Sequence, residues 1–193
     1  MPLTCAQVYD VATNKAVHTP KSYGKSIKPA DLPDGMARFF PLAPDTPPAP
    51  VTDADAEVPA VGTGLPAAIL LPLLESLRED VVEIREALAE VHMRMVGGSL
   101  LIIYEADWER AREGLKWLEE EDEEEEEDDD DEESDEEEGK QRVGPPYLIK
   151  LIDFAHTKIV PGSGPDAGVL KGVDTVLQLI DGRIEQIKTM AAA

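Results

Sequence analysis

The sequence predicts an α+β fold: a small antiparallel sheet packed by helices, with a disordered acidic insert. Two apolar runs of strand length, 99–104 and 147–152, predict the sheet. Two longer stretches, 65–95 and 166–187, repeat apolar residues at helical spacing. Between the two strands lies the run 119–138, in which 19 of 20 residues are acidic. This run has little to bury, so we expect it to be disordered.

We expect residues 1–40 to form the first part of the folded unit. We expect a short strand around Gln7 to Tyr9, a turn at 13–15 and a loop at 22–25. The segment 29–40 predicts a short helix that ends on two phenylalanines.

Residues 41–64 are mostly Pro, Ala, Asp, Thr and Gly, which predicts a solvated linker or long loop. The helix of 65–95 follows, and Gly97 with Gly98 is expected to end it. Pro66 fits its first turn, whereas Pro72 is expected to bend it or to move its start to about residue 71. Its apolar residues alternate at steps of four and three: Leu70, Leu74, Leu77, Val81, Ile84, Leu88, Val91 and Met95.

This apolar stripe allows two arrangements. A heptad pattern permits a coiled-coil dimer, which would make 70–95 an assembly module. The favoured alternative is packing along its own domain, because an apolar strand begins at once at Ser99.

Residues 65–118 form the third segment of the chain, after 1–40 and 41–64. This segment ends in a strand over 99–104 and a short helix over 107–118 capped by Asp107. Like-charge repulsion should stop this helix at the acidic residues. The insert, taken as 119–140, then separates two strands that we expect to pair.

The last part, 141–193, begins with a mostly buried strand that delivers Asp153 at its end. A helix opens at Gly164-Pro165-Asp166 after a loop. A carboxylate at a strand end is how kinase-like folds hold the magnesium of a nucleotide, although such an Asp is more often a turn former or helix cap. The apolar face of the helix consists of Val169, Leu170, Val173, Val176, Leu177, Ile180, Ile184 and Ile187.

Composition narrows the class of protein. The acidic run carries most of the formal net charge of −23, and no basic excess points to nucleic acid. Cys5 is the one cysteine, so no internal disulfide can form, which suits a reducing compartment. No apolar run reaches the length of a membrane span, and no secretory signal is evident.

Three ordered segments carry a resemblance to a known family. They are Val8-Tyr9-Asp10 with Tyr23-Gly24-Lys25-Ser26, then Ser99-Leu100-Leu101-Ile102-Ile103-Tyr104-Glu105, then Ile152-Asp153-Phe154-Ala155-His156-Thr157. Together they resemble the inositol polyphosphate kinase family, and most of all its multikinase branch in fungal form. The resemblance implies the C-terminal lobe of an inositol polyphosphate kinase-like (SAICAR synthase-like) fold.

The family also has an N-terminal lobe and a Pro-x-x-x-Asp-x-Lys-x-Gly motif whose lysine holds the transferring phosphate. The 193 residues contain no such motif. We therefore expect a C-terminal part of the kinase, and an inactive fragment is one possibility. Phosphoryl transfer depends on positioning and charge neutralisation, so this loss should remove most of the rate.

The resemblance implies roles for four residues. Asp153 coordinates Mg²⁺ on the phosphates of ATP, and it is the implied catalytic, nucleotide-binding and metal residue. Ser99 lies near the nucleotide, with a turn residue as the alternative. His156 and Lys21 contact the inositol phosphate. For His156 the alternative is a hydrogen bond to the backbone, and for Lys21 it is an ordinary surface lysine.

The first hypothesis is thus an ATP-dependent transferase acting on inositol phosphates, in the nucleus and cytoplasm. The second is a non-catalytic acidic scaffold in which 119–138 binds basic nuclear proteins. The alternative role of such a run, and its usual one, is a solubilising tail. The third hypothesis is an assembly module built on the heptads of 70–95.

Overall fold

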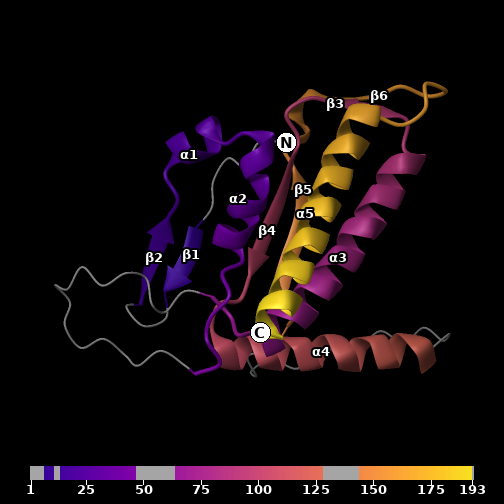
Figure 1. Ribbon diagram of the computed structural model, residues 1–193. Helices are drawn as coiled ribbons and strands as arrows, with labels where there is room; N and C mark the ends of the chain where they lie inside the picture. The colour runs from indigo at the N-terminus through magenta and orange to yellow at the C-terminus, as the bar shows by residue number, and fades with distance from the viewer. Residues whose placement is uncertain (1–6, 11–13, 47–63, 128–143, 193) are drawn as a thin grey trace.

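The computed structural model describes residues 7–10, 14–46, 64–127 and 144–192. Two long helices lie side by side and run antiparallel, with paired strands behind them and a third helix across their lower end (Figure 1). In chain order the elements are β1 (Gln7–Asp10), β2 (Lys15–His18), α1 (Lys21–Ser26), η1 (Pro29–Asp31), α2 (Leu32–Phe39), α3 (Ala67–Glu90), β3 (Met93–Met95), β4 (Ser99–Tyr104), α4 (Trp108–Glu127), β5 (Tyr147–Ile152), η2 (Phe154–His156), β6 (Thr157–Ile159) and α5 (Ala167–Ala191).

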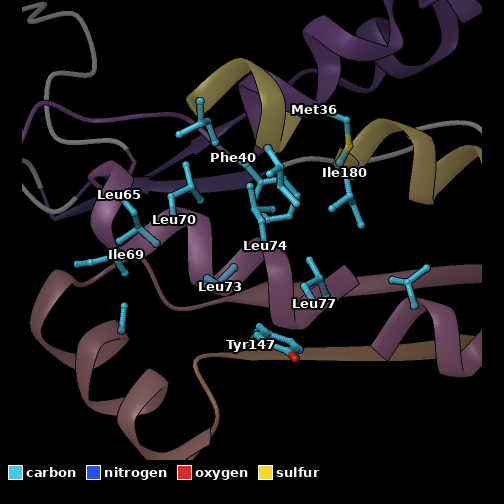
Figure 2. Close-up of a cluster of buried hydrophobic side chains, with 14 of the residues drawn as sticks. Met36, Phe40, Leu65, Ile69, Leu70, Leu73, Leu74, Leu77, Tyr147 and Ile180 are labelled. Atoms are coloured by element: carbon cyan, nitrogen blue, oxygen red, sulfur yellow. The ribbon is translucent and has the colours of Figure 1, made fainter. Parts of the chain in front are cut away.

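The core lies between α3, α5 and the inner face of the β4–β5 pair. Leu70, Leu74 and Leu77 of α3 are fully buried, as is Ile180 of α5, and Phe40 at the end of α2 joins them (Figure 2). The stripe of α3 is therefore covered by its own domain. The predicted packing is confirmed, and the coiled-coil alternative is wrong for these positions.

The strands form three antiparallel pairs, β1–β2, β3–β6 and β4–β5. The predicted pairing of 99–104 with 147–152 is confirmed, with Ser99 opposite Ile152 and Tyr104 opposite Tyr147. Only Tyr147 of β5 is buried, because one face of the pair packs against the core, so the prediction of a mostly buried strand is wrong. The predicted α+β fold, with a small antiparallel sheet packed by helices, is what the chain adopts.

The predicted end of the long helix is wrong. α3 ends at Glu90, not at Met95, because Val91 is extended and the next residues pair with β6 as β3. In β3 the residues Met93 and Met95 are buried while the one between them is exposed. This period of two replaces the helical period. Gly97 and Gly98 form the turn into β4 instead of the end of the helix.

Pro72 does not move the helix start, because α3 begins at Ala67 and contains it. The proline ring removes one internal hydrogen bond near the first turn. Full burial of Leu73, Leu74 and Leu77 beyond it outweighs that loss.

The helix over 107–118 was predicted too short, since α4 continues to Glu127. Asp107 caps it as expected, and its Oδ1 accepts from the backbone N–H groups of Glu109 and Arg110. Glutamate is a good helix former, and each like-charge contact costs only about 0.2–0.5 kcal/mol. Extending a helix that already exists is therefore tolerated. The predicted disorder of 119–140 is therefore wrong for 119–127, and its remainder, 128–140, lies outside the described residues.

Near the start of the chain, the expected loop at 22–25 is helix α1. The Tyr23 ring lies 5.0 Å from the guanidinium carbon of Arg38 on α2, and the Tyr23 carbonyl accepts from the N–H of Ile27 at the end of this helix. The first strand is confirmed, and β2, which was not predicted, completes a hairpin with it.

Residues 41–64 were predicted as a linker. Pro41 and Ala43 exchange backbone hydrogen bonds with Leu65, so the start of this stretch is attached to the core. Residues 47–63 lie outside the described residues. Within the described part of the chain, none of the helices combines the length and the apolar character needed to cross a membrane.

Candidate functional site

The candidate site lies where two strand ladders meet. β3 continues into β4 through residues 96–98, and β5 continues into β6 through residues 153–156. Ser99 pairs with Ile152, and Met95 pairs with Thr157, so three residues on one side oppose four on the other. The longer of these two unpaired segments, 153–156, contains the short helix η2, and we call it the bulge. It carries four of the six residues of the predicted motif, Ile152 to Thr157.

Asp153 is the first residue of the bulge. Its backbone is left-handed, with φ 69° and ψ 51°. Aspartate tolerates this region better than most residues, but it still needs surrounding structure to maintain it. The two flanking ladders supply that structure, and the backbone N–H of Val96 donates to the carbonyl of His156 at 3.2 Å across the bulge. Observed strain of this kind is a reason to suspect function.

The side chain of Asp153 is exposed and caps nothing. Among the described residues its carboxylate has no hydrogen-bond or ion-pair partner, whereas Asp107 and Asp166 both cap helices. The helix-cap alternative for Asp153 is therefore wrong. A carboxylate held at a fixed position and open to solvent is able to receive an external cation.

Ser99 and His156 accompany Asp153. Ser99 is half-buried at the start of β4, opposite the residue that precedes Asp153. His156 is exposed at the end of the bulge, and its ring makes no hydrogen bond within the described part of the chain. The backbone-bonded role considered for His156 belongs instead to His92, whose Nδ1 accepts from the N–H of Gly162 at 2.8 Å. Two of the four predicted site residues, Asp153 and His156, thus lie on one turn, and Ser99 begins the strand that pairs with the residue before this turn.

Lys21, the fourth, is the first residue of α1. Its side chain lies outside the described residues, so its predicted contact with substrate stays a prediction.

The sequence did not single out the residues that hold the bulge in place. Asp166 caps α5 through Oδ1, while its Oδ2 accepts from the backbone N–H of Met95 at 3.0 Å. These hydrogen bonds, that of Met95 first, lower the pKa of the Asp166 carboxyl below its ordinary value. Arg94 donates to the carbonyls of Ser163 and Gly164 at 2.8 and 2.9 Å. Of these contacts, only the helix cap at Asp166 could be recognised in the sequence, where a helix was expected to open at Gly164-Pro165-Asp166.

Thr157, the first residue of β6, directly follows the bulge. Its hydroxyl is buried without a hydrogen-bond partner among the described residues. A buried polar atom in this state is uncommon and costs free energy. Nothing in the sequence distinguishes this threonine from one that bonds to its neighbours.

The described residues contain no cluster of three or more His, Cys, Asp or Glu side chains that could hold a metal ion alone. Magnesium in nucleotide sites does not need such a cluster, because it is held by one or two carboxylates together with substrate phosphates and water. The single open carboxylate of Asp153 fits an ion that arrives with a nucleotide.

Comparison with known proteins gives a consistent result. The family model described as inositol polyphosphate kinase matches residues 2–181. The inositol polyphosphate multikinase of Saccharomyces cerevisiae is 43% identical over 103 residues, which cover 47% of this chain and 29% of that protein.

The crystal structure of the inositol phosphate multikinase Ipk2 of S. cerevisiae, in complex with ADP and Mn²⁺, is similar in fold. Its TM-score is 0.54 at 23% identity, and the match covers 90% of this chain and 53% of that one. The chain thus spans about half the length of the crystallised relative and less of the curated one.

Proposed function

Because the chain belongs to the inositol polyphosphate kinase family, we propose that it forms the metal-binding end of an ATP-dependent kinase that phosphorylates inositol phosphates. The observation that carries the proposal is the Asp153 carboxylate, held in a left-handed conformation on a bulge and free of protein partners in the described chain. Phosphoryl transfer of this kind rests on positioning and on neutralisation of phosphate charge.

Asp153 would hold the divalent ion, which neutralises negative charge on the nucleotide phosphates when it is bound. The left-handed backbone sets the direction in which the side chain of Asp153 leaves the chain. Ser99, which pairs with the residue before Asp153, is proposed as a further contact to the nucleotide.

His156 would contact the phosphorylated inositol. Its ring is exposed and on the same turn as Asp153, so it can donate a hydrogen bond to a phosphate oxygen near the metal. Lys21 is proposed as a second substrate contact, through the charge of its ammonium group.

Metal-dependent nucleotide binding by this chain tests the proposal. Mn²⁺ with ADP should broaden the NMR signals of residues 96–99 and 153–156, because the unpaired electrons of the ion relax nearby nuclei. Asp153→Asn keeps the shape of the side chain and removes its charge, so we expect the broadening to disappear while the fold is kept. Asp45→Asn is the matched control, since Asp45 is also exposed.

Broadening that persists in Asp153→Asn would remove Asp153 from the site. Broadening centred on other residues in the wild-type chain would move the site elsewhere.

A further inference from the structure

Helices α2 and α5 pack against each other, and a groove of about 280 Å³ lies between them. We call it the α2–α5 groove, and none of its residues belongs to the candidate site around Asp153. Along α5 it begins about three turns beyond Asp166. The residues on which the argument rests are those of its lining with a polar group or with no side chain: Asp34, Gln178, Gly182, Arg183 and Gln186.

Arg183 is a buried charge in the wall of this groove. Only 5% of its surface is exposed. Its Nε and Nη2 donate to the carbonyl of Phe40 at 3.0 and 2.7 Å, and its Nη1 donates to Oε1 of Gln186 at 2.5 Å. Both acceptors are neutral, and none of the ion pairs within the described residues includes Arg183. A buried charge is normally paired with an opposite one.

A structural role accounts for only part of this guanidinium. The carbonyl of Phe40 lies at the C-terminal end of α2, where the helix dipole supplies a partial negative charge. Three of the five N–H groups of Arg183 are used in the contacts above, which leaves two without an acceptor among the described residues. Burial lowers the pKa of Arg183, as expected for a desolvated cation. The groove therefore has positive charge and N–H donors in excess.

Gly182, next to Arg183, is the second unusual feature of the groove. It lies inside α5, where glycine is a poor helix former. Its φ is not positive, and a Cβ on it would meet nothing within 4 Å beyond its own turn of the helix. Neither backbone conformation nor packing in the described chain thus requires glycine here. The missing side chain widens the groove beside the buried guanidinium.

The lining defines the chemistry of a ligand. A guanidinium group matches the oxygens of a carboxylate or a phosphate, which accept from its N–H groups. The amide groups of Gln178 and Gln186 add neutral donors and acceptors. Asp34 is the one carboxylate of the lining; it disfavours a bare anion but accepts from a hydroxyl.

We propose that the α2–α5 groove binds a small oxyanion, a carboxylate or a phosphate, that also carries hydroxyl groups. The anionic oxygens accept from the two remaining N–H groups of Arg183, Gly182 leaves room for them, and Asp34 accepts from a hydroxyl. The inference goes beyond the proposed function, because this groove shares no residue with the candidate site and its ligand takes no part in phosphoryl transfer.

NMR titration of the whole chain with glycerol phosphate and, separately, with glycerate tests the proposal. Both probes carry an oxyanion and hydroxyls, so the tighter of the two identifies the source of the oxyanion. We expect saturable shifts of the Gly182 amide and of the Arg183 Nε–H with at least one probe. Sodium chloride at equal ionic strength should not cause them. Shifts no larger than those with chloride, or shifts confined to 96–99 and 153–156, would overturn the proposal.

Gly182→Leu is the decisive variant, because it fills the groove without changing a charge or the contacts of Arg183. We expect at least tenfold weaker binding of the probe, with a melting temperature that is unchanged or higher, since leucine is the better helix former. Thr189→Leu is the matched control, because Thr189 is exposed on the same helix and outside the lining. Unchanged affinity in Gly182→Leu, or an equal loss in both variants, would overturn the proposal.

Two further comparisons test the named contacts. Arg183→Lys keeps the charge but loses the planar fork, so it should bind the probe several-fold more weakly than the wild-type chain. Ethyl phosphate and propionate, which lack the hydroxyls, should also bind more weakly than glycerol phosphate and glycerate. In Asp34→Asn this preference should shrink. A preference for the hydroxyls that is absent in the wild-type chain would refute the contact with Asp34.

Discussion

Asp166, the half-buried N-cap residue of α5, is predicted to be the main anchor of the bulge, and its removal should be costly. Its Oδ1 caps α5 by accepting from Gly168 and Val169, and its Oδ2 accepts from the N–H of Met95. Loss of an N-cap costs about 0.5–2 kcal/mol, and a buried N–H without a partner costs about 1–3 kcal/mol. Met95 is buried, so both costs apply.

We therefore expect Asp166→Ala to lower the free energy of unfolding by roughly 2–4 kcal/mol, the sum of typical values for the two costs. For a chain of this length each 1 kcal/mol shifts the melting temperature by about 2–4 °C. Thermal unfolding followed by circular dichroism would measure the loss. Asp166→Asn should lose less, because asparagine caps helices as well as aspartate does.

The pH dependence of this effect has a definite sign. The pKa of Asp166 in the folded chain is lowered from its ordinary value of about 3.8, chiefly by the hydrogen bond from Met95. Its stabilising contribution is then complete at neutral pH and is lost as the pH falls through the lowered pKa. The gap between wild type and Asp166→Asn should close on acidification. If Asp166→Ala costs no more than Asp45→Ala at neutral pH, the anchoring role is refuted.

Three further predictions follow from other features of the chain. Thr157→Val should leave the melting temperature unchanged or raise it, because it removes a buried hydroxyl that has no partner among the described residues; a large loss would show that the hydroxyl is bonded. Deletion of 119–138 should leave thermal stability unchanged or slightly raised and should abolish any salt-sensitive binding to basic proteins; a much lower melting temperature would contradict this. The 193-residue chain, incubated with Mg²⁺-ATP and inositol trisphosphate, should form little product, because the Pro-x-x-x-Asp-x-Lys-x-Gly motif is not in its sequence; turnover of about 1–100 per second would refute that.

The sequence predicted best what depends on local pattern. The buried stripe of α3 and the cap at Asp107 both follow from residue types at fixed spacing. The pairing of β4 with β5 was the one distant contact predicted correctly, because both are apolar runs of strand length. Predictions failed where a distant contact decides the outcome. The last turn of the expected long helix became β3 because residues more than 60 positions later pair with it. The segment around Tyr23 was expected to be a loop and is helical, and the Tyr23 ring contacts the distant Arg38.

The candidate site shows the same division at the level of single residues. Asp107, Asp153 and Asp166 all stand beside a helix or strand end, and a sequence pattern treats them alike. In the structure two of them use their oxygens on backbone N–H groups, while the carboxylate of Asp153 bonds to no described residue. Asp153 lies on the bulge, whereas Asp107 and Asp166 lie at the starts of helices. The position of the bulge is set by the pairing of strands that are distant in the sequence. The chemistry of Asp153 therefore depends less on its neighbours in sequence than on the strand pairing. This pairing leaves its carboxylate without a hydrogen bond to the described residues.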